Sequence, residues 1–161
     1  MGSEVYVFDV DGVLLDVRER LERARSLARS REDFWRIFFS ESLLDLDRPR
    51  QVAISMLLDR ARRGLVAIVT GRPRRLLRRT IDQLTNLCGV PRSAIWRIEM
   101  RGEGDYRPGW VVKLERILGI VYEGYEVAEV HDDDEELLYR LRRHLPRARL
   151  YLHRGDSFEI L

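Results

Sequence analysis

Near its start the sequence reads Val5-Tyr6-Val7-Phe8-Asp9-Val10-Asp11-Gly12, an apolar run that ends in two aspartates and a glycine. A short apolar run bounded by a glycine turn predicts a strand that is buried on both faces of a parallel sheet. The two carboxylates then lie at the carboxyl end of that strand, which is the edge where open α/β sheets bind their ligands. This stretch therefore predicts both the fold and the place of a site.

Strand and helix patterns alternate along the rest of the chain. Strand-like apolar runs follow at 65–69, 94–98, 126–131 and 149–153, and helical spacing is found at 18–30, from Asp33, at 49–63, at 74–88, around Lys113 and at 135–144. Such alternation is typical of βαβ units. We predict an α/β fold with a doubly wound, Rossmann-like parallel sheet of five strands, forming one domain over 1–161. The connection 13–64 exceeds a simple crossover, which predicts a small helical insertion at 31–47 and no large cap.

Composition restricts the class of protein only loosely. The net charge of +2 over 161 residues does not by itself indicate a polyanionic partner, and the single Cys88 excludes an internal disulfide and fits a reducing compartment. No apolar run approaches the ~20 residues of a membrane helix. We expect a cytoplasmic protein with no membrane partner, and the oligomeric state stays open. The scarcity of Asn, Gln and Met favours a thermophilic source.

A lone lysine and several strand-end polar residues are the candidate site. The chain contains 28 arginines but only one lysine, Lys113, whose compact ammonium differs from a planar guanidinium in the contacts it makes. The strand ends supply the remaining candidates, which parallel topology brings to one edge of the sheet. These residues are Asp9, Asp11, Thr70, Asp132 and Asp133.

Each candidate also has a purely structural interpretation. Asp-x-Asp-Gly is a common turn, and Thr70 is a possible helix N-cap before Pro73. The acids at 132–136 suit the first turn of a helix, and Lys113 suits an exposed surface. The arginines of 72–79 fit either a solvated helix face or contacts with phosphates. Without the arginines, four features remain: the paired aspartates, Thr70, Lys113 and the acids at 132–136. Their occurrence together in this order is much harder to attribute to chance than any one of them.

In this order the residues resemble the haloacid dehalogenase superfamily of phosphohydrolases. The four stretches that carry the resemblance are Phe8-Asp9-Val10-Asp11-Gly12-Val13, Val69-Thr70-Gly71-Arg72, Val111-Val112-Lys113 and Val130-His131-Asp132-Asp133. The resemblance implies that Asp9 is a nucleophile that forms an aspartyl-phosphate and that Asp11 is the general acid and base.

The same resemblance implies how the phosphoryl group and a metal are held. Lys113 offsets phosphoryl charge, while Thr70 and the Gly71 amide bind phosphoryl oxygens. A Mg²⁺ ion, which takes carboxylates, waters and phosphate together, is held by Asp9, the Asp11 carbonyl and Asp133, with Asp132 as the second candidate for the third position.

A further similarity concerns the substrate. Arg101-Gly102-Glu103-Gly104-Asp105-Tyr106-Arg107, six residues before Lys113, resembles the 3′-phosphatase domains of phage polynucleotide kinases, although those carry acids where this chain has Pro108-Gly109-Trp110. We therefore predict Mg²⁺-dependent hydrolysis of phosphomonoesters, with nucleic-acid 3′-phosphate or nucleotide ends ahead of small sugars and organic acids. Arg72 and Arg107 are the expected substrate contacts. A catalytically silent nucleic-acid-binding module is the alternative, whereas a signalling receiver domain would place these residues in a different order.

Overall fold

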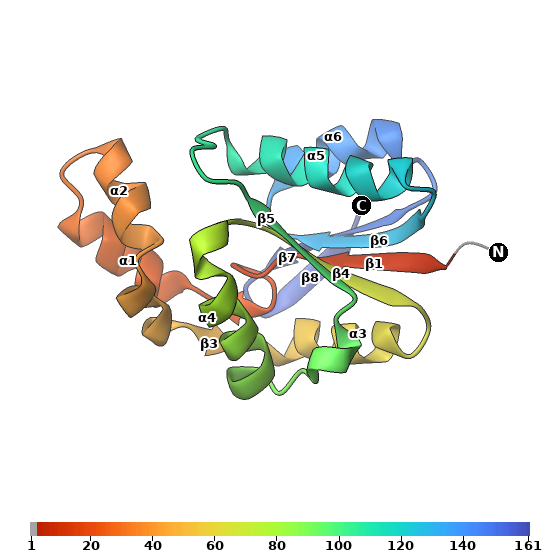
Figure 1. Cartoon of the computed structure of the whole chain (residues 1–161), viewed down its shortest axis with the longest axis horizontal. Helices are drawn as coiled ribbons and strands as arrows, with labels where there is room; N and C mark the ends of the chain where they lie inside the picture. Colours follow the sequence, from red (N-terminus) through yellow and green to blue (C-terminus); the bar gives the residue numbers. More distant parts are fainter. Residues whose placement is uncertain (1–2) are drawn as a thin grey trace.

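The computed structural model describes residues 3–161, and its centre is a six-stranded sheet in the order β5-β4-β1-β6-β7-β8 (Figure 1). The strands are β1 (Glu4–Phe8), β4 (Leu65–Pro73), β5 (Arg97–Arg101), β6 (Glu126–Asp132), β7 (Arg149–Arg154) and β8 (Ser157–Ile160). Every neighbouring pair is parallel except β7 and β8. This topology confirms the predicted α/β fold, with one strand more than expected.

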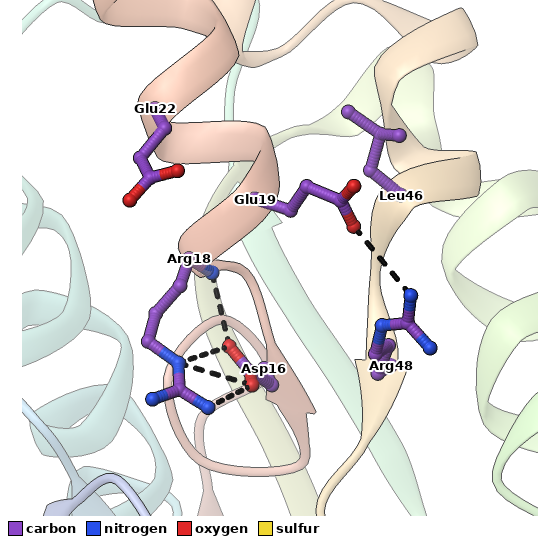
Figure 2. A pocket seen from close by; sticks show the side chains of 6 residues that line it. All are labelled: Asp16, Arg18, Glu19, Glu22, Leu46 and Arg48. Atoms are coloured by element: carbon purple, nitrogen blue, oxygen red, sulfur yellow. Dashed lines mark hydrogen bonds and ion pairs between the residues drawn. The ribbon is translucent and has the colours of Figure 1, made fainter.

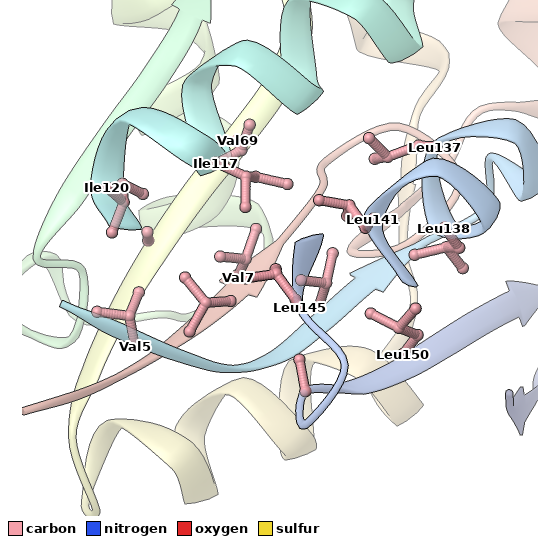
Figure 3. Close-up of a cluster of buried hydrophobic side chains, with 14 of the residues drawn as sticks. Val5, Val7, Val69, Ile117, Ile120, Leu137, Leu138, Leu141, Leu145 and Leu150 are labelled. Carbon is pink, nitrogen blue, oxygen red and sulfur yellow. The ribbon is translucent and has the colours of Figure 1, made fainter. Parts of the chain in front are cut away.

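Helices cover both faces of the sheet. Figure 1 shows α5 (Gly109–Tyr122) and α6 (Glu135–His144) on one face and α3 (Gln51–Ala61) on the other, with α4 (Leu77–Asp82) towards its end. In the cluster of Figure 3, Val5 and Val7 pack with side chains of α5 and α6, such as Ile117 and Leu141. Tyr6 and Phe8 belong to a second cluster with residues of α3. Because successive strand residues point to opposite faces, the unbroken apolar run of β1 is required by two separate cores.

A small helical insertion extends from one end of the sheet. It contains α1 (Arg18–Leu27), α2 (Arg31–Phe38) and the 3₁₀ helix η1 (Glu41–Leu46), and Figure 1 shows α1 and α2 projecting together. Two short antiparallel strands, β2 (Leu15–Asp16) and β3 (Arg48–Pro49), form its base. The predicted range 31–47 contains α2 and η1, but α1 packs against α2 and so belongs to the same helical unit.

Several predicted boundaries were wrong, each for a local reason. Pro49 does not begin a helix, because it pairs with Leu15 in β3, and α3 starts at Gln51. The third strand lies at 97–101 rather than 94–98, since η4 (Arg92–Ala94) follows Pro91 as a turn of 3₁₀ helix. The predicted helix at 74–88 is divided into η2 (Arg74–Leu76), α4 and a π-helical segment, η3 (Gln83–Leu87).

The sixth strand was missed because its sequence shows no buried face. All four residues of β8 are exposed, and the strand is formed by a hairpin turn at Gly155, whose φ is +57°. Among the described residues, no helix combines the length and the apolar character that crossing a membrane requires.

Candidate active site

The carboxyl end of β1 places Asp9 at the centre of the site. Its backbone N–H donates to the carbonyl of His131 on the neighbouring strand β6 at 3.0 Å. The residue is 4% exposed, and its Oδ1 accepts a hydrogen bond from the Val10 N–H at 2.8 Å. The amides of Val13, Leu14 and Leu15 all bond to the Val10 carbonyl, which closes the turn that follows. Asp9 is therefore fixed by the sheet on one side and by a tight turn on the other.

Lys113 joins two of the strand ends. It lies in the first turns of α5, is buried, and its Nζ is 3.2 Å from Asp9 Oδ2 and 3.0 Å from Asp132 Oδ1. Burial alone would lower the pKa of Lys113, but the carboxylates of Asp132 and Asp9 outweigh it and raise this pKa above its ordinary value. The single lysine of the chain is thus a permanent cation between two buried acids.

Three carboxylates gather beside this lysine. Asp9, Asp132 and Asp133 each offer an oxygen, and these atoms lie within 4.8 Å of one another. Asp132 Oδ1 is engaged by Lys113 and by the Asp134 N–H at 2.9 Å. Asp133 is the exposed member of the group and lies against Gly12. Oxygen ligands at this spacing suit a hard divalent cation such as Mg²⁺.

Crowding of like charges shifts the pKa values of these acids. Burial and the charge of Asp132 raise the pKa of Asp9 well above its ordinary value, which Lys113 only partly offsets. Loss of hydration and the same neighbour raise the pKa of Asp133 to about 7. An additional cation among these groups would relieve the repulsion.

Gly12 makes room for the third acid. Its φ is +85°, a region that side chains rarely adopt, and a Cβ built there would lie 2.1 Å from Asp133 Oδ2. The glycine after the two aspartates is therefore required twice, once by the turn and once by the approach of Asp133.

Asp11 is held by two buried arginines. Arg72 Nη2 donates to Asp11 Oδ1 at 2.7 Å, and Arg20 Nη2 donates to the same oxygen at 2.5 Å. Burial acts in the opposite direction, but the guanidinium groups of Arg72 and Arg20 lower the pKa of Asp11 to about 2. Arg72 is 0% exposed and also bonds to Asp47, Thr80 and Gln83. In this structure Arg72 contacts Asp11 and the polar groups behind it, and its role as a substrate contact stays a prediction.

The end of β4 contributes Thr70 and Gly71. Thr70 is buried, and its Oγ1 accepts a hydrogen bond from the Arg72 N–H at 3.1 Å, which leaves the hydroxyl proton free to donate. The carbonyl of Gly71 accepts from Arg101 Nε at 2.9 Å. Arg101 Nη1 also donates to the carbonyls of Asp105 and Arg107, at 3.0 and 2.5 Å. One arginine thus attaches the loop after β5 to the strand that carries Thr70.

Arg107 lies on the outside of this loop. Its guanidinium is paired with Asp105 at 2.7 Å and with Glu115 at 2.6 Å. Asp105 lies two residues before Arg107, and Glu115 lies on α5. With these partners, the Arg107 side chain does not reach the acids at the sheet edge.

One hollow in the described part of the chain lies away from these residues. Figure 2 shows it between the start of α1 and β3, with a volume of about 370 Å³, lined by Asp16, Arg18, Glu19, Glu22, Leu46 and Arg48. Arg18 pairs with Asp16 there, and Arg48 lies 3.8 Å from Glu19. A second hollow of about 260 Å³ does reach the site, because Gly12 and Asp133 are part of its wall. The chemistry is therefore located by the acids and the lysine, and not by the size of a cavity.

Sequence reasoning missed Arg20, Asp47, Gln83 and Arg101 as contributors. Arg20 is one of 28 arginines and occupies a helix that otherwise reads as solvated, so no local signal distinguishes it. Arg101 belongs to the stretch whose resemblance was noted, and that stretch was the one available signal for it.

Comparisons with known proteins place the fold among haloacid dehalogenase-like proteins. A chain of a structure described as the Pnkp1/Rnl/Hen1 complex matches 93% of this chain with a TM-score of 0.69 at 19% identity. A chain of a structure described as the Pnkp1/Rnl/Hen1 RNA repair complex matches 94% with a TM-score of 0.67 at 20% identity. The present chain spans 45% and 42% of those two chains, which is less than half of either.

A haloacid dehalogenase-like hydrolase from Streptococcus pneumoniae is similar over most of its own length. It matches 92% of this chain and 82% of that one, with a TM-score of 0.60 at 12% identity. No family model matches the sequence, and no curated protein matches it. These likenesses show that the chain has a haloacid dehalogenase-like fold, and its three clustered acids could hold a metal ion.

Proposed function

We propose that this protein is a Mg²⁺-dependent phosphomonoesterase that works through an aspartyl-phosphate on Asp9. The observation that carries the proposal is the position of Lys113 Nζ, which lies between Asp9 and Asp132 at 3.2 and 3.0 Å. A buried carboxylate beside a fixed cation at the ligand-binding edge of an α/β sheet suits attack on a phosphoryl group. Catalysis of phosphoryl transfer depends mainly on such positioning and on neutralisation of charge.

The reaction has two balanced steps. First, an oxygen of Asp9 bonds to phosphorus while the bond from phosphorus to the ester oxygen breaks. The leaving oxygen takes a proton from Asp11, and because Asp11 is ionised in the free protein, it must first accept that proton from the phosphate monoanion of the substrate. Next, a water oxygen bonds to phosphorus and gives its proton to Asp11, and the bond from phosphorus to Asp9 breaks. The products are an alcohol and inorganic phosphate, and both aspartates return to their starting state when Asp11 passes its proton to that phosphate.

The donor set at the sheet edge fits a magnesium ion. Asp9, Asp133 and the carbonyl of Asp11 would hold it, with Asp132 as the second candidate for the third position. When bound, the ion would supply positive charge next to the phosphate and the acids. Thr70 would donate its free hydroxyl proton to a phosphoryl oxygen, and the Gly71 amide would donate to another.

The substrate we favour is a nucleic-acid 3′-phosphate or a nucleotide end. The helical insertion is small and is joined to the body by buried contacts of Arg20, so a bulky substrate can approach the edge of the sheet. The likeness to a chain from an RNA repair complex supports the same choice. Arginines 74, 75 and 78, which begin the segment after β4, would supply backbone contacts on this side.

A substrate screen of the purified chain with Mg²⁺ tests the proposal. The panel consists of 3′-phosphorylated oligonucleotides, nucleotides, sugar phosphates and phosphorylated organic acids. Asp9→Asn should abolish turnover, because an amide cannot form the acyl phosphate. Asp11→Asn should form the aspartyl-phosphate slowly and then accumulate it.

The outcomes separate the reaction from the substrate. Activity on small phosphomonoesters with none on oligonucleotides or nucleotides would refute the substrate class but retain the reaction. Wild-type activity in Asp9→Asn would refute the covalent mechanism. Binding of oligonucleotides without any hydrolysis would instead support a nucleic-acid-binding module.

A further inference from the structure

A buried charge cluster joins the helical insertion to the body of the molecule. Its members are Arg20 from α1, Asp47 after η1, Arg72 from β4 and Gln83 at the start of η3, and none is more than 5% exposed. Arginine and aspartate are rarely buried unless they are paired. This cluster meets that condition only when Asp11 is included, since two arginines then face two aspartates.

Asp47 accepts four hydrogen bonds in this cluster. Its Oδ1 accepts from Arg20 Nε at 2.9 Å, and its Oδ2 accepts from Arg20 Nη2 at 3.1 Å. The same Oδ2 accepts from Arg72 Nη2 at 3.2 Å and from Gln83 Nε2 at 3.0 Å. The carboxylate therefore fixes both guanidinium groups, and Arg20 is held in a bidentate way that sets its orientation.

The same two nitrogen atoms serve both aspartates. Nη2 of Arg20 and Nη2 of Arg72 each donate to Asp47 and to Asp11. The Asp47 side chain is 0% exposed, whereas that of Asp11 is 17% exposed. Asp11 is thus on the open side of the arginine pair and Asp47 on the closed side, where no substrate reaches it.

We propose that Asp47 is a positioning residue for Asp11, acting through Arg20 and Arg72. This inference rests on the proposed function, in which Asp11 transfers the proton to the leaving group and takes one from water. Two guanidinium groups side by side repel each other, and Asp47 offsets that repulsion and fixes their distance from Asp11. Because Asp47 follows η1, the proton-transfer group is aligned only when the insertion is docked.

The rates of the Asp47→Asn chain with two different leaving groups distinguish a positioning role from a general loss of structure. A nitrophenolate leaves phosphorus without needing a proton, whereas the alkoxide of a nucleoside 3′-monophosphate requires one. Hydrolysis of the aspartyl-phosphate requires Asp11 as a base with either substrate. For Asp47→Asn we expect a burst of one nitrophenolate per active site at near wild-type rate, followed by slow turnover. Its kcat on the nucleoside 3′-monophosphate should fall about 100-fold, which is the usual cost of a misplacement of about 1 Å.

A matched control lies two residues earlier in the same segment. Asp45 is exposed and, among the residues that the structure describes, pairs with Arg79 alone, so Asp45→Asn should behave as wild type with both substrates. Asp47→Asn overturns the proposal if it slows the burst and the 3′-monophosphate reaction equally, or if it slows neither. A wild-type chain that hydrolyses no phosphomonoester would instead refute the proposed function itself.

If Asp47→Asn does not fold, a milder variant tests whether the position of Arg72 controls proton transfer by Asp11. Thr80 Oγ1 accepts a hydrogen bond from Arg72 Nη1 at 2.9 Å, so Thr80→Val removes one support of Arg72 without removing a charge. It should show the same selective loss on the 3′-monophosphate, smaller in size, with the nitrophenolate burst retained. A uniform loss on both substrates, or none, in a folded Thr80→Val chain would overturn the proposal.

Discussion

At the scale of single residues, Lys113 shows why the kind of cation matters as well as its charge. Its Nζ reaches two carboxylates on different strands from a buried position. An ammonium is compact and donates in three directions, whereas a guanidinium is planar and needs more room. The chain uses arginine at all 28 other basic positions, including the two that hold Asp11.

Lys113→Arg should therefore lose activity although it preserves the charge. We expect kcat/KM to fall about 100-fold or more, which is the usual effect of losing a group that stabilises transition-state charge. The control is Arg116→Lys on the same helix, which should leave kcat/KM near that of wild type. Steady-state kinetics on the best substrate of the screen measures both. An active Lys113→Arg chain would show that the lysine is a matter of composition alone.

Gly12 gives a second prediction at this scale. Gly12→Ala would force a Cβ to within 2.1 Å of Asp133 Oδ2 and would strain a φ of +85°. We expect a loss of stability of about 1–3 kcal/mol and weaker Mg²⁺ binding, because Asp133 must move away from Asp9. Calorimetric titration with Mg²⁺ and thermal unfolding measure the two effects.

Gly124 is a control that separates the effect of backbone strain from the effect of the contact between the new Cβ and Asp133. Its φ is +102°, but a Cβ there would meet nothing within 4 Å. Gly124→Ala should therefore lose stability and keep the Mg²⁺ affinity of the wild type. Equal Mg²⁺ affinity in the Gly12 and Gly124 variants would mean that Asp133 does not bind the ion.

At the scale of elements, two acids of the site lie where β6 ends and α6 is about to begin. The residue after Asp132 and Asp133 is Asp134, the N-cap of α6, whose Oδ1 accepts from the amides of Glu136 and Leu137 at 3.0 and 3.3 Å. The last turn of the same helix carries Arg142, Arg143 and His144, which suits the negative end of the helix dipole. The run of acids at 132–136 therefore contains both candidate ligands and a structural cap.

Asp134→Ala should destabilise the fold without removing a ligand. Loss of an N-cap costs about 1 kcal/mol of unfolding free energy, and Asp134→Ser should recover most of it because serine also caps helices well. Urea unfolding of the three chains measures this. Equal stability of the alanine and wild-type chains would show that α6 does not depend on its cap.

Sequence patterns predicted the strands that are buried on both faces and the helices that bury one face. β1, β6 and α6 lie at or within one residue of their expected ranges, because each buries a regular set of side chains. β8 has no buried residue, so its sequence carries no apolar pattern that would predict a strand. Pro49 is in a strand because it pairs with Leu15, 34 residues earlier, and the sequence around Pro49 does not show this pairing. The strand-end acids follow from topology. The contacts of Arg20 and Asp47 depend on how the insertion docks, which no short stretch of sequence encodes.

At the scale of the whole molecule, a chain of buried polar groups runs beneath the site. Arg60 of α3 pairs with Glu129 at 2.9 Å, Glu129 contacts His131 Nε2 at 2.9 Å, and His131 Nδ1 contacts His153 Nε2 at 3.0 Å. Since Glu129 is an acceptor, His131 must donate from Nε2 and accept at Nδ1. His153 then donates from Nε2, and its buried Nδ1, which has no hydrogen-bond partner within residues 3–161, carries the lone pair.

This arrangement makes the fold sensitive to acid. Protonation of His153 would place an N–H in a buried position with no acceptor, and burial together with His131 and Arg50 lowers the pKa of His153 to about 3. The unfolded chain takes up this proton near its ordinary pKa of about 6.5. The unfolded state therefore binds more protons between these two values, and the free energy of unfolding must fall as the pH falls below about 6.5.

His153→Gln tests this contribution, because glutamine offers a donor to His131 and does not titrate. Urea unfolding at pH 7.5 and at pH 5 gives the acid sensitivity of each chain, and the groups common to both, including Glu129 and His131, cancel in the comparison. We expect the loss of stability on acidification to be smaller in His153→Gln than in wild type by up to about 2 kcal/mol. The exposed His144→Gln should show the sensitivity of the wild type. If His153→Gln loses as much stability on acidification as the wild-type chain, His153 is not held neutral by its burial, and the polar chain beneath the site does not set the acid limit of the fold.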